Sequence, residues 1–240
     1  MRQIQAELRR LPGRPRLVGV CVTHEHADHA SAVVAVCRRF GVPVIASPGT
    51  LDELGRGGLR VEGLAQPVGT TVAVGGFLVT SFGLPHDARQ PVGYLVGFGP
   101  WRVALAVDLG ESCEELISAL RQADLVILDS NHDLRRLLAG PYSGPLKARI
   151  AAPKGHLSNE QAARILLQVA DGRPRTVWLA HLSAVNNSPR LARRTVARIF
   201  EAAGANPVRV DVARRDRPSA VWSPLELATQ GRFDFGAGFT

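Results

Sequence analysis

Three of the seven histidines in this chain of 240 residues fall within one short segment, Thr23-His24-Glu25-His26-Ala27-Asp28-His29. His24 and His26 are two residues apart, so their side chains point the same way if the segment is extended. Asp28 and His29 then turn to a second position. Imidazole and carboxylate groups are suitable ligands for zinc and similar divalent ions. A lone histidine is more often structural, but this cluster predicts a metal site.

The cluster follows an apolar, valine-rich run, Leu17 to Thr23, which predicts a buried strand. Ligands gather at strand ends in open α/β sheets. Strands and helices alternate along the rest of the chain, without an internal repeat or a low-complexity linker. This order predicts an α/β fold class with helices outside the sheets. We expect one domain over residues 1–213 and a C-terminal tail over residues 214–240.

The pattern also predicts the later elements. The expected helices are Ser31 to Phe40, Pro48 to Leu54, Glu111 to Gln122, Ser158 to Ala170 and Pro189 to Ala203. The expected strands are Val42 to Ala46, Val72 to Val74, Phe77 to Phe82, Val92 to Phe98, Arg102 to Val107, Leu125 to Leu128, Thr176 to Ala180 and Val208 to Val212. Gly75-Gly76 predicts a hairpin, and Ser158 with Gln161 predicts a capping box.

The H-x-H-x-D-H string from His24 to His29 resembles the signature of the metallo-β-lactamase superfamily. The resemblance implies an αββα sandwich with a dinuclear metal site at the sheet edge. It also implies three further ligands, each after a later strand, and candidates occur in that order at His86, Asp108 and His181.

By this resemblance one metal is held by His24, His26 and His86, and the other by Asp28, His29 and His181. Asp108 bridges the two ions. We therefore expect two divalent ions per chain, zinc or manganese. Taken singly, His86 and His181 would more often be ordinary histidines, and Asp108 is a common turn residue.

Three further strings resemble the narrower YycJ/WalJ family, and the match runs from about Val18 to Val212. They are L-D-S-N-H-D from Leu128, G-H-L-S-N-E from Gly155 and H-L-S-A-V-N-N from His181. Members are described as metal-dependent nucleases, including 5′-to-3′ exonucleases on single-stranded DNA. The second string also resembles ribonuclease Z, which implies that His156 transfers a proton beside Asp129. Asp28, His156 and Asp129 are the expected catalytic residues.

Weaker candidates have structural alternatives. A phosphate-binding role and a purely structural role in the loop are equally open for Ser183, Asn186 and Asn187, and Ser158 joins them as a candidate substrate-binding residue. His132 could form a structural hydrogen bond or contact substrate. For three residues in a Gly/Pro-interrupted loop, a solvated surface is favoured over contact with nucleic acid; they are Tyr142, Lys147 and Arg149.

The sequence departs from the family at two places. Asp108-Leu109-Gly110 stands where members often have Asp-Thr-Gly, so a hydroxyl is lost while the ligand is kept. The Gly/Ser-rich strand pair and the Asp-Ala-Gly loop with which the family begins are absent. We expect the family's first strands to be lacking here, and an in-frame extension upstream of Met1 to encode them.

The overall composition bears on the cellular location of the protein and on the kind of partner that it binds. The net charge is +8, with 29 basic and 21 acidic residues, which favours an anionic partner such as nucleic acid. Nearly all the basic residues are arginine, so genome composition explains the charge equally well. The three cysteines indicate no disulfide framework, and no apolar run approaches the roughly 20 residues of a membrane span. We expect a cytoplasmic protein without a membrane partner.

The resemblance to the YycJ/WalJ family implies a metal-dependent phosphodiesterase acting on nucleic acid, specifically a 5′-to-3′ exonuclease of single-stranded DNA, and the basic charge supports it weakly. The alternative is a small-molecule hydrolase of the same fold, acting on a thioester or a lactone. A third possibility is a binding module without activity. The pair Asp129 and His156 favours the nuclease over the small-molecule hydrolase, and the complete ligand set opposes the third possibility.

Overall fold

The computed structural model describes residues 2–13, 15–58, 62–205, 209–215, 217–219 and 221–223. The chain divides into two compact units. Unit 1 comprises Met1–Gly83 and Asp87–Phe98, and unit 2 comprises Leu84–His86 and Gly99–Thr240. Residues 224–240 of the predicted tail lie outside the described residues. No helix in the described part of the chain is long and apolar enough to cross a membrane.

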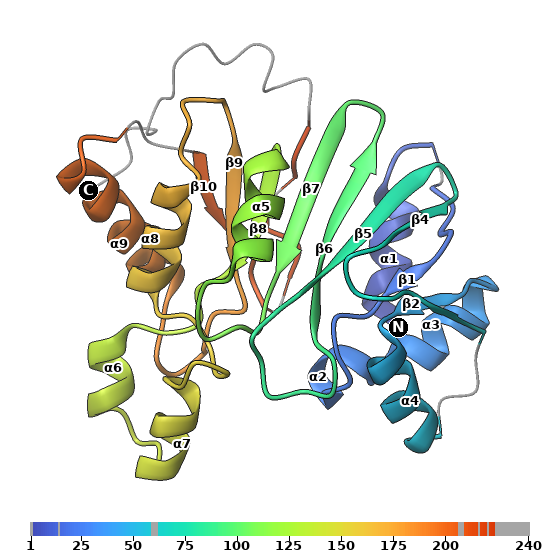
Figure 1. Cartoon of the computed structure of the whole chain (residues 1–240), viewed down its shortest axis with the longest axis horizontal. Coiled ribbons are helices and arrows are strands. Elements are labelled where there is room, and N and C mark those ends of the chain that lie inside the picture. The colour runs from blue at the N-terminus through green and yellow to red at the C-terminus, as the bar shows by residue number, and fades with distance from the viewer. Residues whose placement is uncertain are drawn as a thin grey trace. The chain divides into compact units, whose positions relative to one another are not determined.

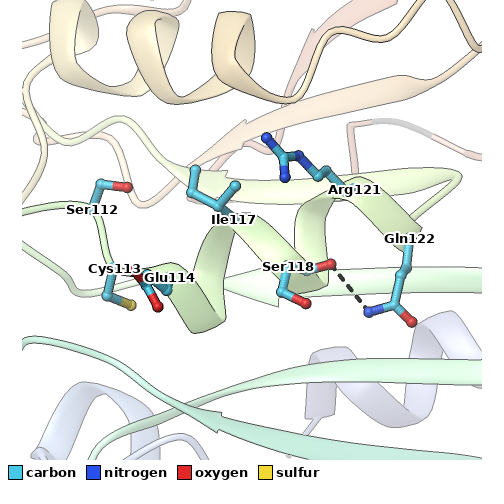
Figure 2. Close-up of a pocket in the computed structure, with 7 residues that line it drawn as sticks. All are labelled: Ser112, Cys113, Glu114, Ile117, Ser118, Arg121 and Gln122. Atoms are coloured by element: carbon cyan, nitrogen blue, oxygen red, sulfur yellow. Dashed lines mark hydrogen bonds between the residues drawn. The ribbon is translucent and has the colours of Figure 1, made fainter.

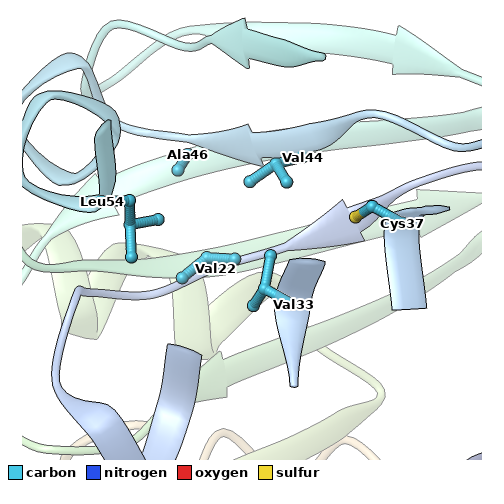
Figure 3. Packing of buried hydrophobic residues seen from close by; sticks show 6 residues of the cluster. All are labelled: Val22, Val33, Cys37, Val44, Ala46 and Leu54. Carbon is cyan, nitrogen blue, oxygen red and sulfur yellow. The ribbon is translucent and has the colours of Figure 1, made fainter. Parts of the chain in front are cut away.

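Unit 1 holds a three-stranded parallel sheet in the order β1 (Val20–Cys21), β2 (Val44–Ala46), β3 (Gly63–Ala65). Its helices are α1 (Arg2–Arg10), α2 (Ala27–Ala30), α3 (Val33–Phe40) and α4 (Pro48–Arg56). Apolar side chains from the sheet region and from α3 and α4 form one core, which Figure 3 shows as Val22, Val33, Cys37, Val44, Ala46 and Leu54. Burying this core fixes the end of β1, from which the histidine cluster continues.

Unit 1 also contains the antiparallel neighbours β4 (Thr71–Val74), β5 (Phe77–Gly83) and β6 (Val92–Phe98). The predicted hairpin is confirmed, because Gly75 and Gly76 adopt φ of 55° and 88° between β4 and β5. The buried Tyr94 hydroxyl on β6 donates to the carbonyls of Val22 and Ile45, at 2.8 and 3.1 Å. Those bonds tie β6 to the segments that surround the histidine cluster.

Unit 2 contains four parallel strands, neighbours in the order β7 (Trp101–Ala106), β8 (Leu125–Asp129), β9 (Thr176–Ala180), β10 (Arg209–Val212). The helices of this unit are α5 (Glu114–Gln122), α6 (Leu134–Ala139), α7 (Gly144–Ile150), α8 (Asn159–Gln168) and α9 (Pro189–Ala202). Helices α8 and α9 pack against each other (Figure 1). The central strands read as near-continuous apolar runs, as expected for a parallel sheet covered on both faces.

The structure corrects several predicted bounds. The strand expected over Leu17 to Thr23 is only Val20–Cys21, because only these two residues pair with β2. The helix expected from Glu111 begins at Glu114, since Cys113 has extended backbone. The loop expected to hold Tyr142, Lys147 and Arg149 contains α7, so Lys147 and Arg149 lie on a helix. Pro145 lies in the first turn of α7, where proline favours a helix start.

Candidate metal centre

The histidine cluster of unit 1 forms a compact group. The buried His24 ring lies 4.6 Å from the His26 ring and 4.2 Å from the His29 ring, centroid to centroid. His26 precedes α2, and this short helix places Asp28 and His29 one turn on, with His29 N donating to His26 O at 2.9 Å. The cluster therefore combines an extended pair of histidines with a helical Asp-His pair, as the spacing predicts.

Glu25 lies inside this string but has a different role. Its Oε1 accepts a hydrogen bond from the backbone N of Arg89, at 2.7 Å. The carboxylate thereby fastens the segment 87–90 to the histidine loop within unit 1. Sequence reasoning does not find this role, because the partner is a backbone amide far along the chain.

In unit 2, three predicted residues meet where parallel strands end. Asp129 closes β8 opposite Ala180, so His181 follows directly on the neighbouring strand. Asp108 comes two residues after Ala106, which pairs with Leu128 of β8. Carboxyl ends of parallel strands share one edge of the sheet, which explains why residues so far apart in sequence converge.

Asp108 and His181 are also the two non-glycine residues in the described part of the chain with positive φ, at 59° and 57°. Left-handed backbone is unfavourable for residues with a Cβ and tends to persist at functional sites, where the surrounding structure imposes it. Asn131 helps to hold one of the two, since its Nδ2 donates to the carbonyl of His181 at 2.9 Å.

His156 lies against both carboxylates. Its Nδ1 is 3.1 Å from Asp108 Oδ1 and 3.3 Å from Asp129 Oδ2. His181 Nδ1 is 2.7 Å from the same oxygen of Asp108. The fully buried Asp129 also accepts the backbone N–H of Asp108, at 3.1 Å. Asp129 thus orients His156, and Asp108 is shared by the imidazoles of His156 and His181.

The electrostatics of this group follow from burial and pairing. Burial lowers the pKa of His156, but the hydrogen bonds to Asp108 and Asp129 raise it by more. The net result is a pKa raised to about 10. Burial raises the pKa of Asp129, and the bond to His156 opposes that rise. Burial lowers the pKa of His132 to about 4, and the charge of His156 acts in the same direction. At neutral pH His132 is therefore neutral.

His86 is oriented by two carbonyls of unit 2. Its Nδ1 lies 3.1 Å from Lys154 O and 3.2 Å from Gly155 O. A histidine that donates Nδ1–H to a carbonyl presents Nε2 as an acceptor, the arrangement common among metal-binding histidines. These carbonyls leave no signal in the sequence. The backbone around Gly155 is tightly packed, because a Cβ added to Gly155 would lie 2.3 Å from the carbonyl oxygens of Arg149 and Ile150.

Gly155→Ala is therefore expected to displace the loop that holds His86 and to destabilise the protein by about 1–3 kcal/mol, the usual cost of overpacking. The matched control is Gly144→Ala in α7, where an added Cβ meets nothing within 4 Å. Urea unfolding and metal content per chain measure the two effects. Equal behaviour of the two variants would contradict the role assigned to Gly155.

The four candidate substrate residues lie in unit 2 around the loop after β9. Ser158 caps α8 in the predicted capping box, and Asn187 Nδ2 donates to the carbonyls of Ser130 and Asn131 and to Asn159 Oδ1. Ser183 Oγ accepts from the backbone N of Asn186, which is itself buried. These contacts give Ser158, Ser183 and Asn187 structural roles, and contact with substrate stays a prediction for all four.

A hollow of about 710 Å³ runs along α5 (Figure 2). It is lined by Ser112, Cys113, Glu114, Ile117, Ser118, Arg121 and Gln122. None of these residues belongs to the predicted site, and within α5 Gln122 Nε2 donates to the carbonyl of Ser118 at 3.1 Å. The hollow does not add to the candidate centre.

The donors of unit 2 fit a divalent ion. Ligand atoms of Asp108, Asp129, His156 and His181 all lie within 4.8 Å of one another. They combine imidazole nitrogen with carboxylate oxygen, which suits zinc, manganese and related ions. The structure thus brings the predicted residues together in two groups: His24, His26, Asp28 and His29 in unit 1, and His86, Asp108, Asp129, His156 and His181 in unit 2.

Known proteins resemble this chain in sequence and in fold. Residues 1–182 match a family described as a beta-lactamase superfamily domain. An exodeoxyribonuclease, YycJ of Bacillus anthracis, is 32% identical over 189 residues, which cover 78% of this chain and 72% of the relative. The metallo-beta-lactamase fold protein YhfI from Bacillus subtilis has a TM-score of 0.64 at 17% identity, covering 88% of this chain and 80% of its own. Zn(2+)-bound PqqB from Methylobacterium extorquens has a TM-score of 0.63 at 18% identity, covering 91% and 81%.

Proposed function

Because this chain belongs to the beta-lactamase superfamily and has the metallo-β-lactamase fold that its sequence predicts, we propose that it is a metal-dependent nuclease. The reaction that we propose for it is 5′-to-3′ exonuclease cleavage of single-stranded DNA. The observation that carries the proposal is the contact of His156 with Asp129 beside Asp108. The likeness to an exodeoxyribonuclease supports nucleic acid as the substrate.

Two divalent ions, zinc or manganese, complete the proposed centre. By the family resemblance, His24, His26 and His86 would hold one ion, Asp28, His29 and His181 would hold the other, and Asp108 would be a ligand of both. The donor types fit this assignment, and His86 is already oriented to offer its Nε2. Bound ions would supply a nucleophilic hydroxide at neutral pH and offset the charge of the phosphate.

The residues of the chain then handle the proton. Hydrolysis forms a bond between water oxygen and phosphorus and breaks the bond from phosphorus to the leaving oxygen. His156 gives its proton from Nε2 to that leaving oxygen, because its Nδ1 is engaged by the carboxylates. Asp129 holds the ring in this orientation. A proton from the consumed water restores His156, so one water yields a phosphate monoester and a hydroxyl.

End-labelled oligonucleotides test the substrate and the polarity. With Zn²⁺ or Mn²⁺, single-stranded DNA labelled at its 5′ end is expected to release labelled mononucleotide at once. DNA labelled at its 3′ end is expected to shorten progressively. RNA of the same sequence and a thioester serve as comparison substrates. Rapid thioester turnover without cleavage of either nucleic acid would contradict the nuclease and favour the small-molecule hydrolase.

A cytoplasmic location stays a prediction.

A further inference from the structure

Helices α6 and α7 leave the sheet of unit 2 after β8 and return before α8 (Figure 1). Both ends of this segment adjoin the candidate centre. At its start, Asp133 N donates to Asn186 O at 3.0 Å, in the loop that follows β9. At its end, His156 N donates to the carbonyl of Ile150 at 2.8 Å. We call residues 134–154 the α6–α7 arm.

The arm is anchored but carries exposed apolar side chains. Leu137 is fully buried, and Lys147 Nζ on α7 donates to the carbonyl of Leu138 on α6, at 2.6 Å. The side chains of Leu134, Leu138 and Leu146 are nevertheless exposed, at 44%, 61% and 37%. Leu134 and Leu138 are four residues apart and so share one face of α6. Apolar side chains gathered on a surface often mark an interaction site.

The charge of the arm has one sign. Its charged residues are Arg135, Arg136, Lys147, Arg149 and Lys154, and no aspartate or glutamate occurs between Leu134 and Asn159. Both lysines of the chain lie in the arm. All of these side chains except the half-buried Lys147 are exposed. A stretch of this kind complements a polyanion.

We propose that the α6–α7 arm is the docking surface for the single-stranded nucleic acid whose phosphodiester reaches the candidate centre. Arginine binds phosphate in two-pronged fashion and stacks its flat group on unpaired bases, while exposed leucines offer apolar contact. The arm ends at Lys154, whose carbonyl orients His86, so a docked strand adjoins the candidate ligands. The inference rests on the proposed function and adds the surface that holds the polymer.

The test variant is Arg135→Glu/Arg136→Glu on α6, and its matched control is Arg193→Glu/Arg194→Glu on α9. Each pair consists of adjacent, exposed arginines on a helix of unit 2. Each single arginine-to-glutamate replacement changes the net charge by two. Because each variant carries a pair of such replacements, both variants lose the same net charge. Fluorescence polarisation of a labelled single-stranded oligonucleotide, without divalent metal and over a range of salt, measures the Kd. Cleavage of that oligonucleotide is compared with cleavage of bis(p-nitrophenyl) phosphate.

The α6 variant is expected to raise the Kd at low salt by about tenfold or more, and the α9 control much less. The slope of log Kd against log salt should fall by about 1.4 if two contacts are lost, because each single-strand phosphate contact contributes about 0.7. The ratio of kcat/KM on the oligonucleotide to kcat/KM on the small diester should fall with it.

Two results with the α6 variant would overturn the arm as the docking surface while sparing the proposed nuclease activity. One is an α6 variant that matches the α9 control although the unmodified protein cleaves DNA. The other is an equal loss on both substrates, which would place the arginines' effect at the centre. If the unmodified protein neither binds nor cleaves nucleic acid, the proposed function itself fails. Displacement of bound oligonucleotide by an acidic peptide at equal charge concentration would indicate a protein partner. It would also overturn the α6–α7 arm as a docking surface for nucleic acid.

Discussion

Asp108→Asn is expected to lower phosphodiester hydrolysis by more than about 100-fold while the protein stays folded. Asparagine matches aspartate in size and tolerates left-handed backbone, so the φ of 59° is kept. The change removes the negative charge that His156 and His181 approach at 3.1 and 2.7 Å. Loss of a side chain that only orients a metal ligand already costs about 10- to 100-fold, so loss of a carboxylate proposed to bind both ions should cost more.

The matched control is Asp124→Asn, which changes a carboxylate at the opposite end of β8. Asp124 accepts the backbone N of Arg102, at 2.8 Å, a bond that asparagine can keep. Turnover, metal per chain and the thermal midpoint are measured for both variants. Asp28→Ala, which removes a predicted ligand from unit 1, should reproduce the loss seen for Asp108→Asn. A well-folded Asp28→Ala protein with unchanged turnover would contradict the metal centre.

His156→Ala is expected to slow nucleic-acid cleavage by about 10² to 10⁴, the usual contribution of general acid catalysis, with metal content unchanged. The physical reason is that the leaving alkoxide needs a proton, which His156 is placed to give. The loss should shrink on bis(p-nitrophenyl) phosphate, whose nitrophenolate leaves without a proton. Rates on both substrates and metal analysis of the purified variant check the expectation.

Asp129→Asn separates orientation from proton transfer. In the proposed mechanism Asp129 acts through His156, so the double variant His156→Ala/Asp129→Asn should lose little more activity than His156→Ala alone. Equal losses on both substrates, or an ion lost from His156→Ala, would reassign His156 as a ligand. Its contact with Asp108, 3.1 Å from Nδ1, makes that reassignment the specific alternative.

Local signals in the sequence account for what it predicts well. The cluster at His24–His29 needs only one strand end and one helical turn, and the capping box at Ser158 spans one turn of helix. The hairpin at Gly75-Gly76 is equally local. Strand ends together with family resemblance predict the positions of Asp108, Asp129 and His181, and the parallel register of β7, β8 and β9 supplies the physical reason that they meet.

Long-range contacts account for what the sequence does not predict. The carbonyls of Lys154 and Gly155 orient His86 across the fold, and backbone groups of this kind are the same in every residue. The amide of Asn131 on the carbonyl of His181 depends on the pairing of two distant loops. The sequence does not predict helix α7 for another reason, because glycine and proline at a helix start resemble loop residues when each is considered alone.

The central claim is that divalent ions at this centre drive phosphodiester hydrolysis, and metal titration tests it most directly. Protein freed of metal by chelation is titrated with Zn²⁺ or Mn²⁺ while metal uptake and cleavage of labelled single-stranded DNA are followed together. We expect no cleavage at the start, then activity that rises with uptake and reaches its plateau at about two ions per chain. Full cleavage by the metal-free protein, or metal uptake without any cleavage, would contradict the account.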